Sequence, residues 1–347
     1  MSNATRCFVP SLLVDIINNR VSCGKELMEP VSSFVSGVCL VVDISGFTKL
    51  SAEFCLLGKT GIDRLQLATN DYLRELVDIV YRFGGEIMKF AGDALICVFT
   101  NVDNLGKSSA WVNRTRSTIF HTDSKDSDDS VEVVHLTEDC NHPTSMTTPV
   151  DPTIISSATV FRALICAEKL RNVKNDKLTV HVGMSCGEMC FGILGGAANR
   201  WECLVSGSCI QEISSCLDDA PTREIAMTNG CKIAMQAGNY TRSRADGRVL
   251  IDLITPSGPC KCSLHPMPSG NFLVQSIDGN DFGIGAFSPT AAADVDERAL
   301  PILQQFVPLP IADKLEAQAE LHYLAEIREV TTMFMKVRIS LCCSFFF

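Results

Sequence analysis

Two aspartates, Asp43 and Asp93, are the residues of this chain best suited to chemistry. Asp43 ends an apolar run, and Asp93 follows Gly92 between two further apolar runs. Carboxylate oxygens are hard ligands that suit Mg²⁺ or Mn²⁺ bound together with substrate phosphates. Two such ions, about 3.5–4 Å apart, stabilise the attacking and the leaving oxygen of a phosphoryl reaction. The pair therefore indicates a two-metal site for a nucleoside triphosphate.

The elements around Asp43 explain how its carboxylate would be presented. Alternating β-branched residues over 38–43 predict a buried strand that ends at Asp43. Gly46 lets the backbone turn so that successive N–H groups face an anion. Phe47 and Thr48 then open a helix, whose N-terminus is suited to phosphate.

Asp93 is expected at the tip of a hairpin. Residues 86–90 and 94–99 read as two strands joined by a tight turn. Apolar residues at helical spacing over 60–83 predict an amphipathic helix between the two aspartates. If the first strand lies beside the hairpin, both carboxylates converge at one edge of a sheet. Each aspartate alone is more simply a turn residue that bonds its own backbone, but the two motifs together favour the metal site.

The arrangement strand, DISGFT, helix, FGGEIMKFAGDAL resembles the catalytic domain of class III nucleotidyl cyclases, and is most similar to the first catalytic domain (C1) of bicarbonate-responsive soluble adenylyl cyclases. The resemblance implies conversion of ATP to cyclic AMP and pyrophosphate at a site shared by two related domains, C1 and C2. It implies that two Mg²⁺ or Mn²⁺ ions are held by the carboxylates of Asp43 and Asp93 and a backbone carbonyl of Ile44. The residues that it places at the nucleotide are Ile44, Ser45, Gly46, Phe47, Thr48 and Lys89.

A second stretch carries the same resemblance. Residues 178–196 are similar to the glycine-rich hairpin of the family, and 200–207 are similar to the strand and turn that follow it. The residues alone predict a hairpin with close backbone packing, since glycines recur through an alternating apolar pattern.

Departures from the family pattern limit what this chain can do alone. The positions of the ribose-orienting Asn and the transition-state Arg of the complementary domain fall on Gln211 and Ser215, and the purine-selecting position falls on Leu204. Loss of one preorganised donor typically costs about 10²–10³ in rate, so a homodimer should be nearly silent. We therefore expect a C2-like partner domain, in cis or in trans.

Three positions bear on regulation and purine choice. In the C1 domains of the family, the position of Lys89 belongs to the bicarbonate site. An equal alternative is that Lys89 is simply a solvated lysine of the hairpin. Ser214 replaces the Arg of that site, which argues against bicarbonate sensitivity because an Arg fork is the natural partner of this anion. Leu204 does not reveal whether ATP or GTP is preferred.

Two alternatives to an enzyme remain open. A catalytically inactive pseudocyclase would bind nucleotide or a partner without turnover. A structural dimerisation module would use Asp43 and Asp93 only as turn residues.

The expected fold is an α+β sandwich of ferredoxin-like βαββαβ topology, with helices on one face of an antiparallel-rich sheet. The expected divisions are an N-terminal segment 1–35, a catalytic domain 36–102 plus 156–255, a polar and disordered insert 103–155, a helical C-terminal linker 256–320, a truncated start of a second cyclase domain 321–336, and an unassigned tail 337–347.

Composition agrees with a protein of the cytoplasm. The chain has 347 residues and a net charge of −10, which argues against nucleic acid or an anionic membrane as the partner. No basic segment followed by an apolar one opens the chain, and no apolar run reaches the roughly 20 residues that a membrane span needs. The 17 cysteines are scattered through apolar segments, as expected of reduced thiols.

Overall fold

The structure is a computed structural model that describes residues 8–24, 28–100, 155–175, 177–255, 258–279, 295–309 and 311–312. Apart from Ile155, the expected insert lies outside these residues. So do the expected start of a second domain and the tail.

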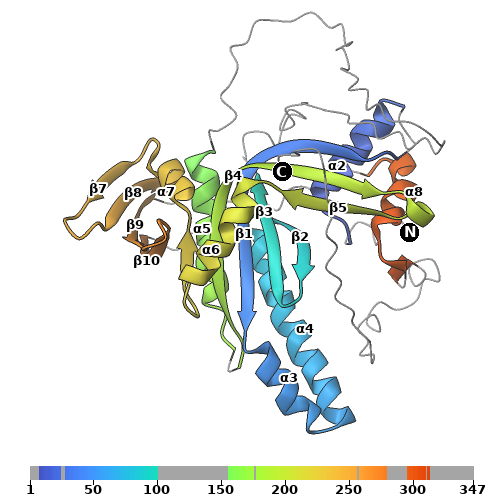
Figure 1. Ribbon diagram of the computed structural model, residues 1–347, viewed down its shortest axis with the longest axis horizontal. Coiled ribbons are helices and arrows are strands. Elements are labelled where there is room, and N and C mark those ends of the chain that lie inside the picture. The colour runs from blue at the N-terminus through green and yellow to red at the C-terminus, as the bar shows by residue number, and fades with distance from the viewer. Residues whose placement is uncertain are drawn as a thin grey trace, which may run out of the picture.

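One large sheet organises the molecule (Figure 1). Its first four strands run in the order β2, β3, β1, β4 and pair antiparallel throughout. Along the chain they alternate with helices as βαββαβ, so the α+β class and the predicted topology are confirmed. The elements are β1 (Val31–Ser45), α3 (Phe47–Cys55), α4 (Lys59–Arg82), β2 (Glu86–Ala91), β3 (Ala94–Thr100), α5 (Ser157–Arg171) and β4 (Thr179–Gly195).

The sheet continues beyond β4 through β6, β10, β9, β8 and β7, while β5 pairs with the second half of β4. Residues 258–279, which we expected to be linker, form β9 and β10, and β10 joins the sheet by pairing with β6. The domain boundaries otherwise stay predictions. The strands are β5 (Trp201–Ser206), β6 (Ile225–Met227), β7 (Tyr240–Ser243), β8 (Val249–Thr255), β9 (Gly258–Pro266) and β10 (Phe272–Gly279).

Helices cover both faces of the sheet, not one face as expected. Helices α3, α4, α5 and α7 (Asn229–Gln236) pack on the larger core, which includes Leu40 and Val42 of β1. Helix α6 (Ser208–Asp219) packs on the opposite face, where Ile213 contacts the cluster of Cys39 and Val41. Because β1 is apolar on both faces, a helix on one side alone would leave half of it exposed.

The hairpin predicted within 178–196 does not turn inside this segment but only at its end, where β4 turns back to pair with β5. Strand β4 runs unbroken to Gly195, because β1 extends back to Val31 and pairs with it over its whole length. The turn comes only at Gly195 and Gly196, which have φ of 146° and 106°.

Helix α2 (Ser11–Ser22) and helix α8 (Leu300–Leu303) lie together at one end of the molecule (Figure 1). They share a second core with Phe191 and Ile193 of β4 and Trp201 of β5.

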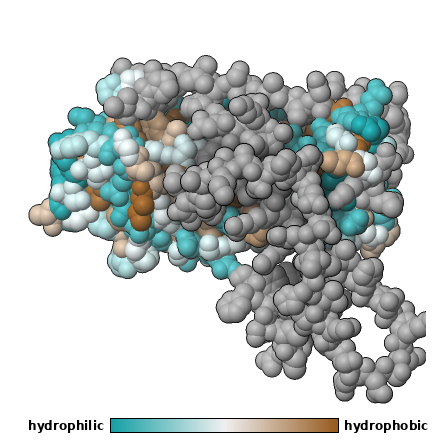
Figure 2. Space-filling model, turned by 90° about the horizontal axis from the view of Figure 1, so that it is seen from above, coloured by the Kyte–Doolittle hydropathy of each residue, from teal (hydrophilic) through white to brown (hydrophobic). Residues whose placement is uncertain are grey.

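At the opposite end, where β7 to β10 lie, the face in Figure 2 shows polar surface interrupted by a narrow apolar strip. No helix within the described part of the chain is long and apolar enough to cross a membrane.

Candidate active site

The two aspartates meet because β1 and β3 are neighbours. Asp43 is paired in register with Ala94, the residue after Asp93. The Ile44 N–H donates to the Asp93 carbonyl oxygen at 3.2 Å, which joins the end of β1 directly to the hairpin tip. The structure therefore brings together the strand end and the hairpin turn that the sequence placed at a common edge.

The environment of Asp43 disfavours its charge. Partial burial raises the pKa of Asp43, the neighbouring His181 lowers it, and the nearby charge of Asp93 raises it again. Asp93 itself is exposed at the turn. Two carboxylates that repel each other at a partly buried edge form a site that gains from a cation.

His181 is the neighbour of Asp43 that the sequence reasoning missed. It lies opposite Asp43 in the pairing of β1 with β4. Its Nε2 is 3.4 Å from Asp43 Oδ2, and its Nδ1 is 3.3 Å from Ser45 Oγ. A neutral imidazole with its proton on Nε2 satisfies both contacts, donating to the carboxylate and accepting from the hydroxyl. The only sign of His181 in the sequence was a polar side chain between the apolar Val180 and Val182. That pattern does not show which strand His181 faces.

Gly46 makes the turn that follows Ser45. Its φ is 98°, and a Cβ added there would lie 2.4 Å from the Lys177 carbonyl oxygen. Gly46 is also the N-cap of α3, without a side-chain cap, so the first N–H groups of the helix have no partner within it. Phe47 packs partly against the core while Thr48 is exposed. Gly46 therefore begins a helix, and the binding of phosphate at this helix start stays a prediction.

A second contact secures α3 beside this turn. Lys177 Nζ lies 2.5 Å from Glu53 Oε2 and over the ring of Phe54, 5.2 Å from its centroid. The Asn175 side chain accepts from the backbone N–H groups of Lys177 and Leu178. The loop before β4 is thereby held against the same helix that begins at Gly46.

The structure places Lys89 differently from the other predicted residues. It lies on β2, where its Nζ is 3.8 Å from Glu202 Oε2 of β5, and both side chains are largely exposed. This loose ion pair links β2 to β5, and its net contribution to stability should be small.

The positions that correspond to catalytic and regulatory residues elsewhere in the family make structural contacts or are exposed. Ser215 Oγ donates to the Glu212 carbonyl at 2.8 Å and accepts from Asn271 Nδ2 at 3.2 Å. Gln211 and Ser214 are exposed on α6, and Leu204 is 39% exposed on β5. Ser215 is therefore part of a structural contact between α6 and the start of β10.

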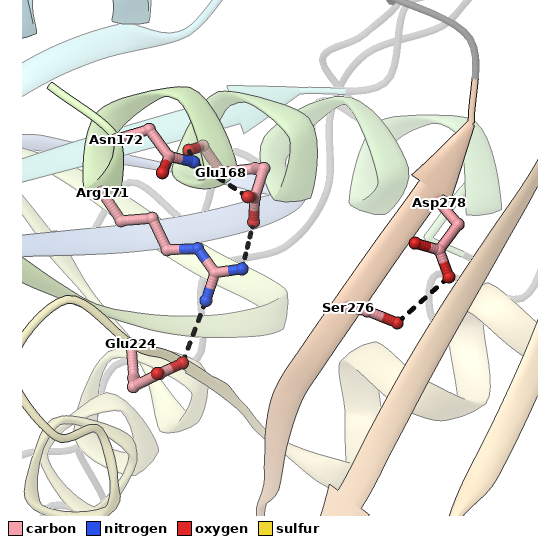
Figure 3. A network of polar contacts seen from close by, with 6 residues as sticks. All are labelled: Glu168, Arg171, Asn172, Glu224, Ser276 and Asp278. Carbon is pink, nitrogen blue, oxygen red and sulfur yellow. Dashed lines mark hydrogen bonds and ion pairs between the residues drawn. The ribbon is translucent and has the colours of Figure 1, made fainter.

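The loop before β6 is fixed close to the same edge of the sheet. Arg171 bridges Glu168 at 2.6 Å and Glu224 at 3.0 Å (Figure 3). The backbone of this loop bonds to β4, since Val182 N–H donates to the Glu224 carbonyl at 3.0 Å. Arg171 thus ties α5 to the loop beside the strand that carries His181.

The residues at this edge fit a divalent metal bound with a nucleotide. The predicted donors are two carboxylates and a backbone carbonyl, all of them hard oxygen ligands. Within the residues that the structure describes, no group of three or more His, Cys, Asp and Glu side chains forms a complete metal cage. The remaining ligands would have to be phosphate oxygens and water, which is how Mg²⁺ is commonly bound.

Comparison with known proteins agrees with the resemblance read from the motifs. The chain is 39% identical over 72 residues to adenylate cyclase type 10 of Oryctolagus cuniculus and 38% identical over 72 residues to that of Homo sapiens. Each match covers 20% of this chain but only 4% of the relative. No protein-family model matches the chain.

Solved cyclase structures are similar over a larger part of the chain. The adenylyl cyclase CyaB of P. aeruginosa matches 74% of this chain and 100% of its own, with 17% identity and a TM-score of 0.40. The guanylyl cyclase Cya2 matches 73% of this chain and 98% of its own, with 15% identity and a TM-score of 0.40.

Proposed function

We propose that this chain supplies the metal-binding half of an adenylyl cyclase site, which converts ATP to cyclic AMP and pyrophosphate together with a second cyclase domain. The observation that carries the proposal is the junction of Asp43 and Asp93, made by the pairing of β1 with β3 and by the bond from Ile44 N–H to the Asp93 carbonyl. The sequence similarity to adenylate cyclase type 10 supports ATP as the substrate.

Each predicted residue has a distinct part in this proposal. Asp43, Asp93 and the Ile44 carbonyl hold Mg²⁺ or Mn²⁺, which would supply charge neutralisation and a lower pKa for the ribose 3′ hydroxyl. The turn over 45–48 receives the triphosphate at the N-terminus of α3. In an acidic chain, metal ions and backbone N–H groups are the natural means of holding a polyanion.

The proposed site is incomplete without a partner domain. The Ser215 hydroxyl is used to hold Asn271, and no cationic side chain stands at this position to meet the transition state. A C2-like domain, in cis or in trans, would supply the missing donors. We place the protein in the cytoplasm and expect no regulation by bicarbonate, because Ser214 offers a neutral hydroxyl where an Arg fork is needed.

The test measures cyclic AMP and cyclic GMP made from ATP or GTP with Mn²⁺. The full chain is assayed alone and mixed with a second-type cyclase domain from a related protein. Asp93→Ala is the inactive variant, and Asp78→Ala, at an exposed position of α4, is the matched control. We expect product only in the mixture, loss of product with Asp93→Ala and full activity with Asp78→Ala.

The same assay decides between this proposal and its rivals. A pseudocyclase, which the structural use of Ser215 favours, would bind Mn²⁺ and ATP tightly and give no product in either arrangement. A dimerisation module would show no metal affinity, and Asp93→Ala would then alter only stability.

A further inference from the structure

Four cysteines lie on three adjoining elements: Cys186 on β4, Cys209 and Cys216 on α6, and Cys231 on α7. Cys209, Cys216 and Cys231 are buried, while Cys186 is only half-buried. The pairing of β4 with β6 ends at Met184 and Met227, so Cys186, two residues further along β4, pairs with Val38 of β1 on one side and has no β6 residue on the other. It faces the first turn of α7, which carries Cys231.

The approach of α7 to Cys186 is close. A Cβ added at Gly230 would lie 3.7 Å from Cys186 Sγ and 3.6 Å from its carbonyl oxygen. The next residue, Cys231, is part of the apolar cluster against which Cys186 packs. Thr228 Oγ1 donates to Cys231 Sγ at 3.6 Å and accepts from Cys231 N–H at 3.5 Å, which fixes Cys231 in the first turn.

The two thiols differ in the way that a reacting pair requires. The neighbouring Cys231 thiol lowers the pKa of Cys186, although burial opposes this. Burial raises the pKa of Cys231 well above its ordinary value. Burial also raises the pKa of Cys209 to about 11 and that of Cys216 to about 12, so these neighbours should stay as inert thiols.

We propose that Cys186 and Cys231 form an oxidisable dithiol, a modification site at which a hydroperoxide such as hydrogen peroxide closes a disulfide between β4 and the first turn of α7. The proposal rests on the half-buried position of Cys186, the close approach of the first turn of α7 to its sulfur and the fixed position of Cys231. It does not depend on cyclase activity.

The reaction balances with hydrogen peroxide as the oxidant. The Cys186 thiolate attacks one peroxide oxygen, the O–O bond breaks, and the departing hydroxide takes up a proton as water while Cys186 becomes a sulfenic acid. The Cys231 sulfur then attacks the sulfenic sulfur, the S–S bond forms, and the second oxygen leaves as water. Two thiols and one peroxide thus give one disulfide and two waters.

The experiment maps disulfides in the full chain after graded hydrogen peroxide. Free thiols are blocked with iodoacetamide, and the chain is digested with trypsin without reduction. Cleavage after Lys177, Arg200, Arg223 and Lys232 puts Cys186 in peptide 178–200 and Cys231 in peptide 224–232. We expect these two peptides to be joined, two hydrogens lighter than their sum, and to separate on reduction.

Matched variants identify the sulfurs. Peptide 178–200 also contains Cys190, which is half-buried on the same strand. The cross-link should vanish in Cys186→Ser and in Cys231→Ala and persist in Cys190→Ser, with circular dichroism confirming that each variant is folded. If a variant is not folded, the wild-type chain is mapped by fragmentation of the joined peptides, which distinguishes Cys186 from Cys190.

Two results would overturn the proposal. One is a cross-link that survives Cys186→Ser. The other is a wild-type Cys186 that is still fully alkylated at peroxide concentrations that already oxidise the exposed Cys55.

Discussion

His181 Nε2 lies 3.4 Å from Asp43 Oδ2, across the pairing of β4 with β1. Residues directly opposite each other on antiparallel strands have Cβ atoms about 4.5–5.5 Å apart, so the sheet itself brings the imidazole to the carboxylate. The other nitrogen of the ring contacts Ser45 Oγ at 3.3 Å, one residue before the turn at Gly46. His181 therefore orients the strand end that carries the proposed metal ligand.

Replacing Asp43 should separate metal binding from folding. Asp43→Asn removes a carboxylate whose pKa is raised, chiefly by burial, which means that the fold disfavours its ionised form. We expect the free energy of unfolding in EDTA to stay the same or to rise, while Mn²⁺ binding is lost in calorimetric titration. Asp78→Asn on the exposed face of α4 should change neither quantity. A large loss of stability in Asp43→Asn would instead show that Asp43 is a structural turn residue.

His181→Ala should weaken metal binding without removing it. Groups that hydrogen-bond a metal ligand typically contribute about 10–100-fold to metal affinity, and His181 is such a group for Asp43. We expect a loss of about that size in a Mn²⁺ titration of the full chain. Ser45→Ala, which removes only the second contact of the ring, should have a smaller effect. Equal Mn²⁺ affinity in His181→Ala and wild type would contradict this orienting role.

Gly46→Ala should lower the free energy of unfolding more than replacement of another glycine with positive φ, such as Gly92. Gly46 has φ of 98° and only 2.4 Å between an added Cβ and the Lys177 carbonyl, whereas Gly92 has φ of 69° and open space. The left-handed conformation alone costs about 1–2 kcal/mol, which is the loss expected for Gly92→Ala. Gly46→Ala should lose about 1–3 kcal/mol more, because the backbone contact has to open. Urea unfolding of the two variants checks this, and equal losses would rule out the close contact.

Arg171→Ala should be among the more damaging changes outside the core. Arg171 is 13% exposed and bridges Glu168 and Glu224, so its removal leaves two facing carboxylates without their cation (Figure 3). We expect a loss of about 2–4 kcal/mol in unfolding free energy. Arg82→Ala, at the exposed last turn of α4, should stay within about 0.5 kcal/mol of wild type. A similar small effect of both changes would show that the network in Figure 3 contributes little.

Local patterns were enough to predict the elements that carry the proposed ligands. The alternation over 38–43, the turn at Gly92 and the helical spacing over 60–83 correspond to β1, the β2–β3 hairpin and α4. These features depend on residues near one another in the chain, whose conformational preferences act without the rest of the fold. The run over 178–196 was misread because its inner glycines are also compatible with a turn, whereas the chain turns only at Gly195 and Gly196. Only the length of β1 keeps it as one strand.

The sequence by itself determined that two acidic turns follow apolar strands, and that Gly46 opens a helix suited to an anion. Only the tertiary structure decided that His181 faces Asp43, that Lys89 pairs with Glu202, and that Cys186 lies against the first turn of α7, which carries Cys231. The physical reason is that strand register and helix packing are set by contacts between segments far apart in the chain. A shift of one residue in the pairing of β1 with β4 would turn His181 away from Asp43 to the other face of the sheet.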